Sequence, residues 1–252
     1  QKYLDMYSDQ KINLAAFFGM ITNIDDNVGA TRQLLKDLGL YENTIFIFTT
    51  DNGTAGGSSV FNAGMKGKKG SEYDGGHRVP LFLHWPAGGM NQKKVVARLV
   101  HAVDVVPTLL ELCGASGDGT DWPDRFVVTD SQRVVDPVKW RKTSVMSEEW
   151  RLVNGTELYH IDKDPGQTTN VAADHPEQVA EMTKFYDAWW AELEPTFSQS
   201  TELYLGHPDQ EAVVSLTGHD WISDTVSPPW NQGHIRKAAG AAPPKPKKNQ
   251  NA

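Results

Sequence analysis

The sequence predicts an α/β fold followed by a small antiparallel sheet that carries one covering helix. Three observations predict this arrangement. Apolar residues recur at helical spacing over residues 14–38. Two short runs, residues 45–48 and 80–85, are apolar without alternation, as expected of strands covered on both faces of a parallel sheet. After residue 141 the pattern changes to a β-hairpin and an amphipathic helix, which indicates a second, smaller unit.

The helices of the first part carry their own stop signals. The apolar stripe of the first helix ends at Leu38, and Gly39 is typical of a helix that ends on a glycine with positive φ. A second helix is predicted after residues 80–85, with Asp104 as its N-cap and Gly114 as its stop. Residues 114–141 are polar and irregular, and we expect them to form a connector.

The smaller unit opens with a hairpin. Asn154-Gly155 separates two apolar runs, and this pair tolerates the positive φ angles of a type I′ turn. Asp164-Pro165-Gly166 predicts a further turn. Asp174 and Glu177 fit a capping box in front of a helix that runs to Leu193.

These patterns predict four segments. Residues 1–141 form the C-terminal part of an α/β domain, and residues 142–198 form the small antiparallel subdomain. Residues 199–237 are expected to be an extension. The tail at 238–252 is rich in Ala, Pro and Lys and is expected to be disordered.

Composition limits the function classes. The 252 residues are 39% hydrophobic, which allows a real core in one or two domains. The formal net charge of −8 argues against nonspecific nucleic-acid binding. A single cysteine, Cys113, excludes a disulfide framework and a thiolate metal cluster. No apolar run has the length of a membrane span.

The N-terminus shows no signal-peptide pattern and opens on Gln1 with helical character. We expect the chain to lack its true beginning. The missing targeting signal therefore says nothing about the compartment.

Two hard oxygen ligands follow the first predicted strand. Asp51 and Asn52 lie at its carboxyl end, where open α/β sheets bind their ligands. A carboxylate and an amide oxygen suit Ca²⁺ or Mg²⁺. Asp51-Asn52-Gly53 is also typical of a plain tight turn, so the tripeptide alone leaves both interpretations open.

A lysine-rich glycine loop comes next in the chain. It reads Lys66-Gly67-Lys68-Lys69-Gly70 and leads into Asp74-Gly75-Gly76-His77-Arg78-Val79-Pro80. A lysine run in isolation is usually a solvated surface, although such a loop can hold a small anion. Together with the Asp51-Asn52 pair, in this order, the loop favours a metal-assisted anion site.

These stretches closely resemble the second half of a type I sulfatase, a formylglycine-dependent, arylsulfatase-like family. That family carries a Lys-Gly pair, a few residues and then an acidic-Gly-Gly-x-Arg-Val-Pro sequence that leads into a core strand. The resemblance covers residues 1–193. It implies an alkaline-phosphatase-like sheet with helices on both faces, of which this chain holds a part, and the family's small C-terminal subdomain.

The resemblance assigns roles to four residues. It implies that Asp51 and Asn52 ligate Ca²⁺, with Mg²⁺ less favoured, and that Lys69 is the catalytic lysine that contacts the sulfate. His77 follows the glycine pair and would border the substrate pocket. The alternative for His77 is a structural or exposed histidine.

The residues around these four are expected to support them. Lys66 and Lys68 are expected to be solvated. The Gly75-Gly76 pair would serve a close backbone approach. Arg78 is expected to pair with Asp74 or another acid rather than with substrate.

The family's nucleophile has no counterpart in this sequence. It is a formylglycine made from Cys or Ser in a Cys/Ser-x-Pro/Ala-x-Arg motif, and it attacks sulfur with the help of a metal and nearby cations. Cys113 is followed by Gly114-Ala115-Ser116-Gly117, which lacks the arginine of that motif, and its place on an apolar helix face predicts a core cysteine. We expect the formylglycine in a segment that precedes this chain, and the chain alone to be inactive.

The resemblance therefore predicts a sulfuric ester hydrolase, acting on a sulfated small molecule or a sulfated glycan. Two alternatives stay open. A two-metal phosphoester hydrolase is disfavoured because Asn52 stands where such relatives commonly carry a zinc-binding histidine. A catalytically inactive remnant that binds an anion or calcium is the other. By family analogy the protein would be periplasmic or extracellular, and its oligomeric state is not predicted.

Overall fold

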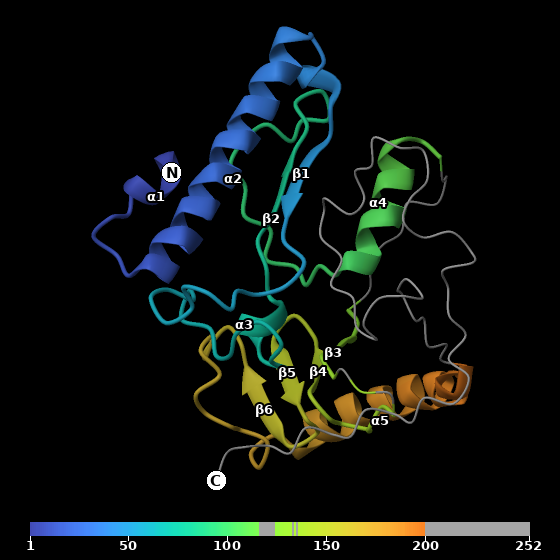
Figure 1. Ribbon diagram of the computed structural model, residues 1–252. Coiled ribbons are helices and arrows are strands. Elements are labelled where there is room, and N and C mark those ends of the chain that lie inside the picture. The colour runs from blue at the N-terminus through green and yellow to red at the C-terminus, as the bar shows by residue number, and fades with distance from the viewer. Residues whose placement is uncertain (116–123, 133, 135, 200–252) are drawn as a thin grey trace, which may run out of the picture. The chain divides into compact units, whose positions relative to one another are not determined.

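A computed structural model describes residues 1–115, 124–132, 134 and 136–199 (Figure 1). The helices are α1 (Lys2–Asp5), α2 (Ile12–Asp37), α3 (Asp74–His77), α4 (Val105–Leu112) and α5 (Pro176–Leu193), with the 3-10 turns η1 (Tyr41–Asn43), η2 (Ala102–Asp104) and η3 (Glu194–Gln199). The strands are β1 (Phe46–Thr49), β2 (Leu81–His84), β3 (Val127–Asp130), β4 (Thr143–Met146), β5 (Trp150–Val153) and β6 (Glu157–His160).

The elements from α1 to α5 belong to one compact unit, Gln1–Phe197. The predicted extension and tail lie outside the described residues from residue 200 on. None of the helices in the described part of the chain is both long and apolar enough to cross a membrane.

The two apolar runs of the first part form a two-stranded sheet. β1 and β2 pair antiparallel, with Phe46 opposite His84 and Thr49 opposite Leu81. The expectation of parallel strands is wrong for this pair, because the two strands run antiparallel. The expected cover on both faces is missing too, since Phe82 is 65% exposed. An unbroken apolar run predicts a strand with two apolar faces, but it does not predict which way the neighbouring strand runs.

The helix boundaries of the first part were predictable from local signals. α2 ends at Asp37, and Gly39 with a φ of 69° donates its N–H to the Lys36 carbonyl. Asp104 precedes α4, yet its side chain does not cap that helix. Its carboxylate accepts the His101 N–H at 2.8 Å and so caps η2, the turn in front. The prediction that the Asp104 side chain caps the helix over residues 105–112 is therefore wrong, because that side chain caps the preceding turn η2.

A four-stranded antiparallel sheet in the order β3-β4-β5-β6 forms the second part. β3 comes from the segment expected to be an irregular connector, so that expectation is wrong for residues 127–130. The β5–β6 hairpin forms as predicted, with φ of 51° at Asn154 and 72° at Gly155.

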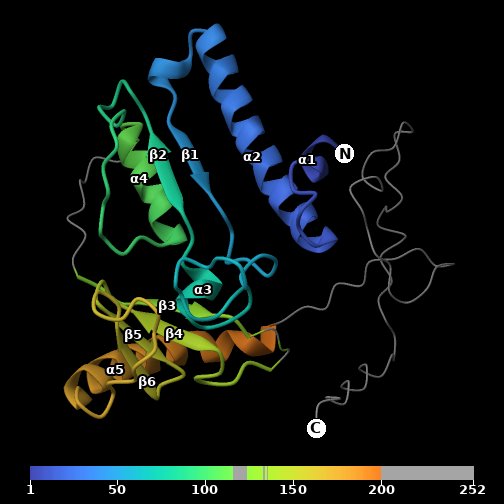
Figure 2. The same cartoon turned by 90° about the vertical axis from the view of Figure 1, so that its left-hand side faces the viewer.

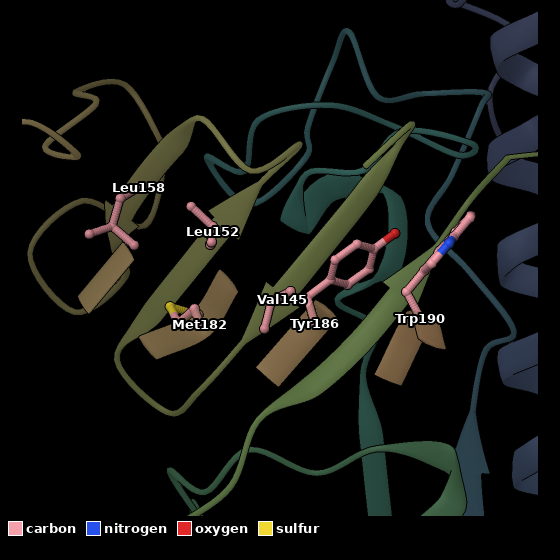
Figure 3. Packing of buried hydrophobic residues seen from close by; sticks show 6 residues of the cluster. All are labelled: Val145, Leu152, Leu158, Met182, Tyr186 and Trp190. Carbon is pink, nitrogen blue, oxygen red and sulfur yellow. The ribbon is translucent and has the colours of Figure 1, made fainter. Parts of the chain in front are cut away.

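One face of this sheet packs against α5. Val145, Leu152 and Leu158 from the sheet meet Met182, Tyr186 and Trp190 from the helix, as Figure 3 shows. α5 begins after His175 with Pro176 in its first turn, and no side chain caps it. The predicted capping box of Asp174 and Glu177 is therefore wrong, because the helix starts at a proline instead.

The opposite face of the sheet is covered by the loop that carries α3 (Figure 2). Val153, Tyr159 and Ile161 form a second buried cluster there, with Tyr73 packed against it. Because side chains alternate along a strand, β5 and β6 present one set of residues to α5 and the other set to this loop. The loop with the predicted site residues therefore packs on the face of the sheet opposite α5.

Candidate functional site

The two predicted metal ligands follow β1 directly. Asn52 Nδ2 donates to Asp51 Oδ2 at 2.5 Å, so the two side chains lie side by side. Their oxygens are hard ligands of the kind Ca²⁺ prefers, but Ca²⁺ takes six to eight of them. Among the described residues no group of three or more His, Cys, Asp or Glu side chains could hold a metal. Asp51 and Asn52 therefore fit as part of a cation site, not as a whole one.

Glycines let the Asp51-Asn52 turn touch α3. Gly53 donates its N–H to the Gly76 carbonyl at 2.9 Å. A Cβ on Gly53 would lie 1.9 Å from the Gly75 carbonyl oxygen, a distance that no side chain tolerates. A Cβ on Gly75 would in turn meet the Lys66 and Gly67 carbonyls at 2.6 and 2.5 Å. The predicted close backbone approach of the Gly75-Gly76 pair is confirmed.

Lys69 is held beside the same turn through its backbone. Its N–H donates to the Thr54 carbonyl at 3.0 Å, three residues after Asp51. Its side chain is exposed and lines a hollow of about 490 Å³. The structure therefore brings the predicted sulfate contact and the predicted metal ligands onto one loop system.

Asp74 anchors this loop system to the four-stranded sheet. Its carboxylate is fully buried and accepts a hydrogen bond at 3.0 Å from Nε of Arg151, a residue of β5. Arg78 lies 3.4 Å away, which confirms the predicted pair. The Asp74 N–H donates to Gln167 Oε1 at 2.9 Å. Burial opposes ionisation of Asp74, but His77 and Arg151 outweigh it and hold its pKa below the usual 3.8.

His77 lies against Asp74 and is largely buried. Its Nε2 atom is 3.5 Å from Asp74 Oδ1, and its side chain is 13% exposed. Neither ring nitrogen makes a hydrogen bond within the described part of the chain. The geometry gives His77 a contact inside the loop, and its role at a substrate pocket stays a prediction.

Lys66 is tied to the sheet, and the expectation that it is solvated is wrong. Its ammonium donates to the Tyr159 hydroxyl at 3.0 Å and lies 3.5 Å from Glu157. It also sits 4.0 Å from the centre of the Tyr73 ring, a cation–π contact. Lys68 is exposed, as predicted. Sequence spacing could not separate these lysines because Tyr159 and Glu157, the polar partners of Lys66, lie about ninety residues away.

Glu157 interacts with several polar groups where the loop that carries α3 meets β6. It accepts hydrogen bonds from Tyr73 at 2.9 Å and from Tyr159. Burial, and then the Glu157 carboxylate, raises the pKa of Tyr159, so the phenol stays protonated and donates. The hydrogen bond from Tyr73 attaches the loop that carries α3 to β6. The Glu157 charge that the Tyr73 and Tyr159 hydroxyls surround is paired with Lys66.

Cys113 is exposed at the end of α4, so the expectation of a core cysteine is wrong. The apolar pattern of α4 is real, but Val106 is 63% and Leu110 46% exposed. The described residues do not cover that face of α4, and a sequence pattern cannot show whether a face is covered.

Arg151 is the main residue that sequence reasoning missed. It lies in β5 between apolar neighbours and is buried. A charged residue at an inward position of a strand requires a partner of opposite charge, and this signal was present in the sequence. The identity of the partner, Asp74, was not, because 77 residues separate the two.

Comparisons with known proteins agree on one family. A sulfatase family model matches residues 1–115. An arylsulfatase of Clostridium perfringens (strain 13 / Type A) is 26% identical over 214 residues, which cover 77% of this chain and 43% of that protein. Arylsulfatase J of Mus musculus is 36% identical over 115 residues, which cover 44% of this chain and 19% of that protein.

The fold agrees as well. The crystal structure of Ps i-CgsB in complex with k-i-k-neocarrahexaose superposes with a TM-score of 0.64 at 26% identity. The match covers 75% of this chain and 46% of that chain. The α/β, alkaline-phosphatase-like fold class is confirmed by this likeness. The chain thus spans less than half the length of these relatives.

Proposed function

Because residues 1–115 match the sulfatase family model and the relatives found are sulfatases, we propose that the whole protein is a sulfuric ester hydrolase that releases sulfate from an alcohol. The observation that carries the proposal is the pair of backbone hydrogen bonds around Gly53. One joins Gly53 to Gly76 and the other joins Lys69 to Thr54, so a hard-ligand turn and a lysine share one rigid loop system. Such a layout would support sulfate ester cleavage, because a cation and a lysine could together neutralise charge on the sulfate oxygens.

In this proposal Asp51 and Asn52 hold one side of a Ca²⁺ site, with Mg²⁺ as the less favoured ion. When bound, the cation would polarise the sulfate oxygens. Lys69 would contact the sulfate and neutralise charge that builds up on its oxygens as the ester bond breaks. His77 would border the pocket from α3, where its contact with Asp74 fixes the ring.

The nucleophile would be the family's formylglycine. The 252 residues contain no Cys or Ser followed by the x-Pro/Ala-x-Arg context. The residues of this chain therefore supply part of the cation site and the sulfate contact. We propose that the chain alone does not turn over substrate.

The substrate would be a sulfated glycan or a sulfated small molecule. Ps i-CgsB, the structural relative at 26% identity, was solved with a neocarrahexaose. That likeness supports a carbohydrate ligand. The charge of the lysine loop supports an anionic one.

The experiment measures hydrolysis of 4-nitrophenyl sulfate by the product of the whole gene. Lys69→Met should lower kcat/KM by about a hundredfold, since losing one donor to a developing oxyanion costs this much. Lys68→Met is the matched control, because it removes the same charge from the same loop at an exposed position. It should keep activity within about twofold of the original protein, as expected for a surface substitution.

Two results would contradict the proposal. Equal losses in both variants would show that Lys69 has no special contact with sulfate. Hydrolysis of 4-nitrophenyl phosphate with zinc, and none of the sulfate, would favour the phosphoester hydrolase despite Asn52.

A further inference from the structure

The hollow beside Lys69 is lined by three cations from two distant segments. Lys69 and Gly70 come from the lysine loop, and Arg141 and Lys142 come from the loop between β3 and β4. The remaining lining residues are neutral: Ala55, Ser131, Gln132 and Val134. Its volume of about 490 Å³ is that of a pocket for a small ligand.

The loop between β3 and β4 is fastened next to the lysine loop. Lys142 Nζ donates to the Gly70 carbonyl at 3.4 Å, and Ser131 Oγ donates to the Ser71 carbonyl at 3.4 Å. Gln132 braces the loop from within, because its side chain bonds both the N–H and the carbonyl of Val138. These hydrogen bonds between the two loops therefore keep Lys69, Arg141 and Lys142 close to one another.

Arg141 is presented by two residues with left-handed backbones. Trp140 has a φ of 63° and Lys142 a φ of 53°, and residues with side chains rarely adopt these values. Trp140 is held in place by the core, since its N–H donates to the Tyr186 hydroxyl at 3.1 Å. Such backbone strain persists only where the surroundings enforce it, and it is common at functional sites.

The positive charge of the hollow is not neutralised by an acid on its wall. No salt bridge joins Lys69, Arg141 or Lys142 to an acidic residue in the described part of the chain. Asp130, at the end of β3, accepts hydrogen bonds from Gln132 and Thr143. Like charges gathered around a concave surface attract anions.

We propose that Arg141 and Lys142 bind a second sulfate group of the substrate, next to the sulfate that Lys69 contacts. The proposal rests on the proposed function and names its substrate class, a glycan that carries more than one sulfate. Arg141 offers the planar, bidentate donor set that suits a sulfate, and Lys142 adds a point charge. Both are specificity residues, since the scissile ester would lie at Lys69.

The test is binding of sucrose octasulfate to the product of the whole gene, by isothermal titration calorimetry. Salt at 0.15 M limits nonspecific attraction, because charges are screened beyond about 8 Å. Arg141→Gln/Lys142→Gln should weaken binding about tenfold, which corresponds to about 1.4 kcal/mol. Lys93→Gln/Lys94→Gln is the matched control: two adjacent, exposed lysines outside the hollow, with the same change in net charge.

A further variant separates binding from folding. Arg141→Gln alone keeps the Lys142–Gly70 bond that fastens the loop and should still weaken binding about threefold. Equal weakening in the two double variants, or no binding to the unsubstituted protein, would overturn the subsite. Absence of 4-nitrophenyl sulfate hydrolysis by the whole gene product would instead overturn the proposed function and leave the binding result standing.

Discussion

At the scale of single residues, one buried ion pair joins the predicted site to the sheet beneath it. Arg151 and Asp74 are both buried, and each is the other's closest opposite charge. A buried pair adds little net stability because desolvation opposes its attraction, but removal of one partner leaves a stranded charge. The pair therefore fixes where α3 sits, and with it the Gly75-Gly76 contact that supports the metal-ligand turn.

We expect Arg151→Met to lower the free energy of unfolding by about 3 kcal/mol, because it strands the Asp74 carboxylate. Urea unfolding followed by tryptophan fluorescence measures the change. Arg78→Met is the matched control, since Arg78 contacts the same carboxylate but its side chain is 52% exposed. It should cost less than about 1 kcal/mol, as exposed ion pairs do.

A second substitution checks the cause. Adding Asp74→Asn to Arg151→Met removes the stranded charge and should restore part of the lost stability. A loss in Arg151→Met no larger than in Arg78→Met would show that the pair does not hold the loop.

At the scale of elements, local chemistry was predictable and partners were not. The Asn154-Gly155 turn and the Gly39 stop follow from backbone preferences of one or two residues, and both were predicted correctly. The antiparallel pairing of β1 with β2 was not, because an apolar run does not encode its partner's direction. The contacts of Lys66 were missed for the same reason, since Tyr159 lies far along the chain.

The hairpin turn offers a sharp test of element stability. Gly155 has a φ of 72°, and a Cβ there would lie 2.9 Å from the Trp140 ring. Gly155→Ala should therefore lower the free energy of unfolding by about 2–3 kcal/mol, from backbone strain and the clash together. The new methyl group would also displace Trp140, the residue that precedes Arg141.

Gly89 provides the matched control for this substitution. Its φ of 75° is nearly the same, but a Cβ there would meet nothing within 4 Å. Gly89→Ala should show the backbone strain alone, about 1 kcal/mol. Equal losses at both positions would mean that Trp140 yields to the new methyl group.

At the scale of the whole described chain, buried apolar residues concentrate in the second part. Among the described residues that are hydrophobic and buried, Ala15 alone comes from before residue 127. The first part instead exposes large side chains, among them Phe82, Val106 and Leu110. The four-stranded sheet and α5 thus hold a complete core, whereas β1, β2 and α4 carry apolar faces without cover from the described residues.

This uneven core predicts two levels of stability in one chain. In hydrogen exchange followed by mass spectrometry, amides of β4, β5, β6 and α5 should exchange slowest, since burial and packing limit local opening. Amides of β1, β2 and α4 should exchange far faster, although they are also hydrogen-bonded. Leu152→Ala, at a fully buried position, should cost about 2–5 kcal/mol and speed exchange throughout the four-stranded sheet and α5.

Leu110→Ala is the matched control, because it removes the same side chain from a helix position that is 46% exposed. It should leave the slow amides of the sheet unchanged. If Leu152→Ala speeded exchange equally in α2, β1 and α4, the described chain would unfold as one cooperative unit. The site loop would then depend on the whole chain for its position, and not on the sheet that the Arg151–Asp74 pair and Lys66 attach it to.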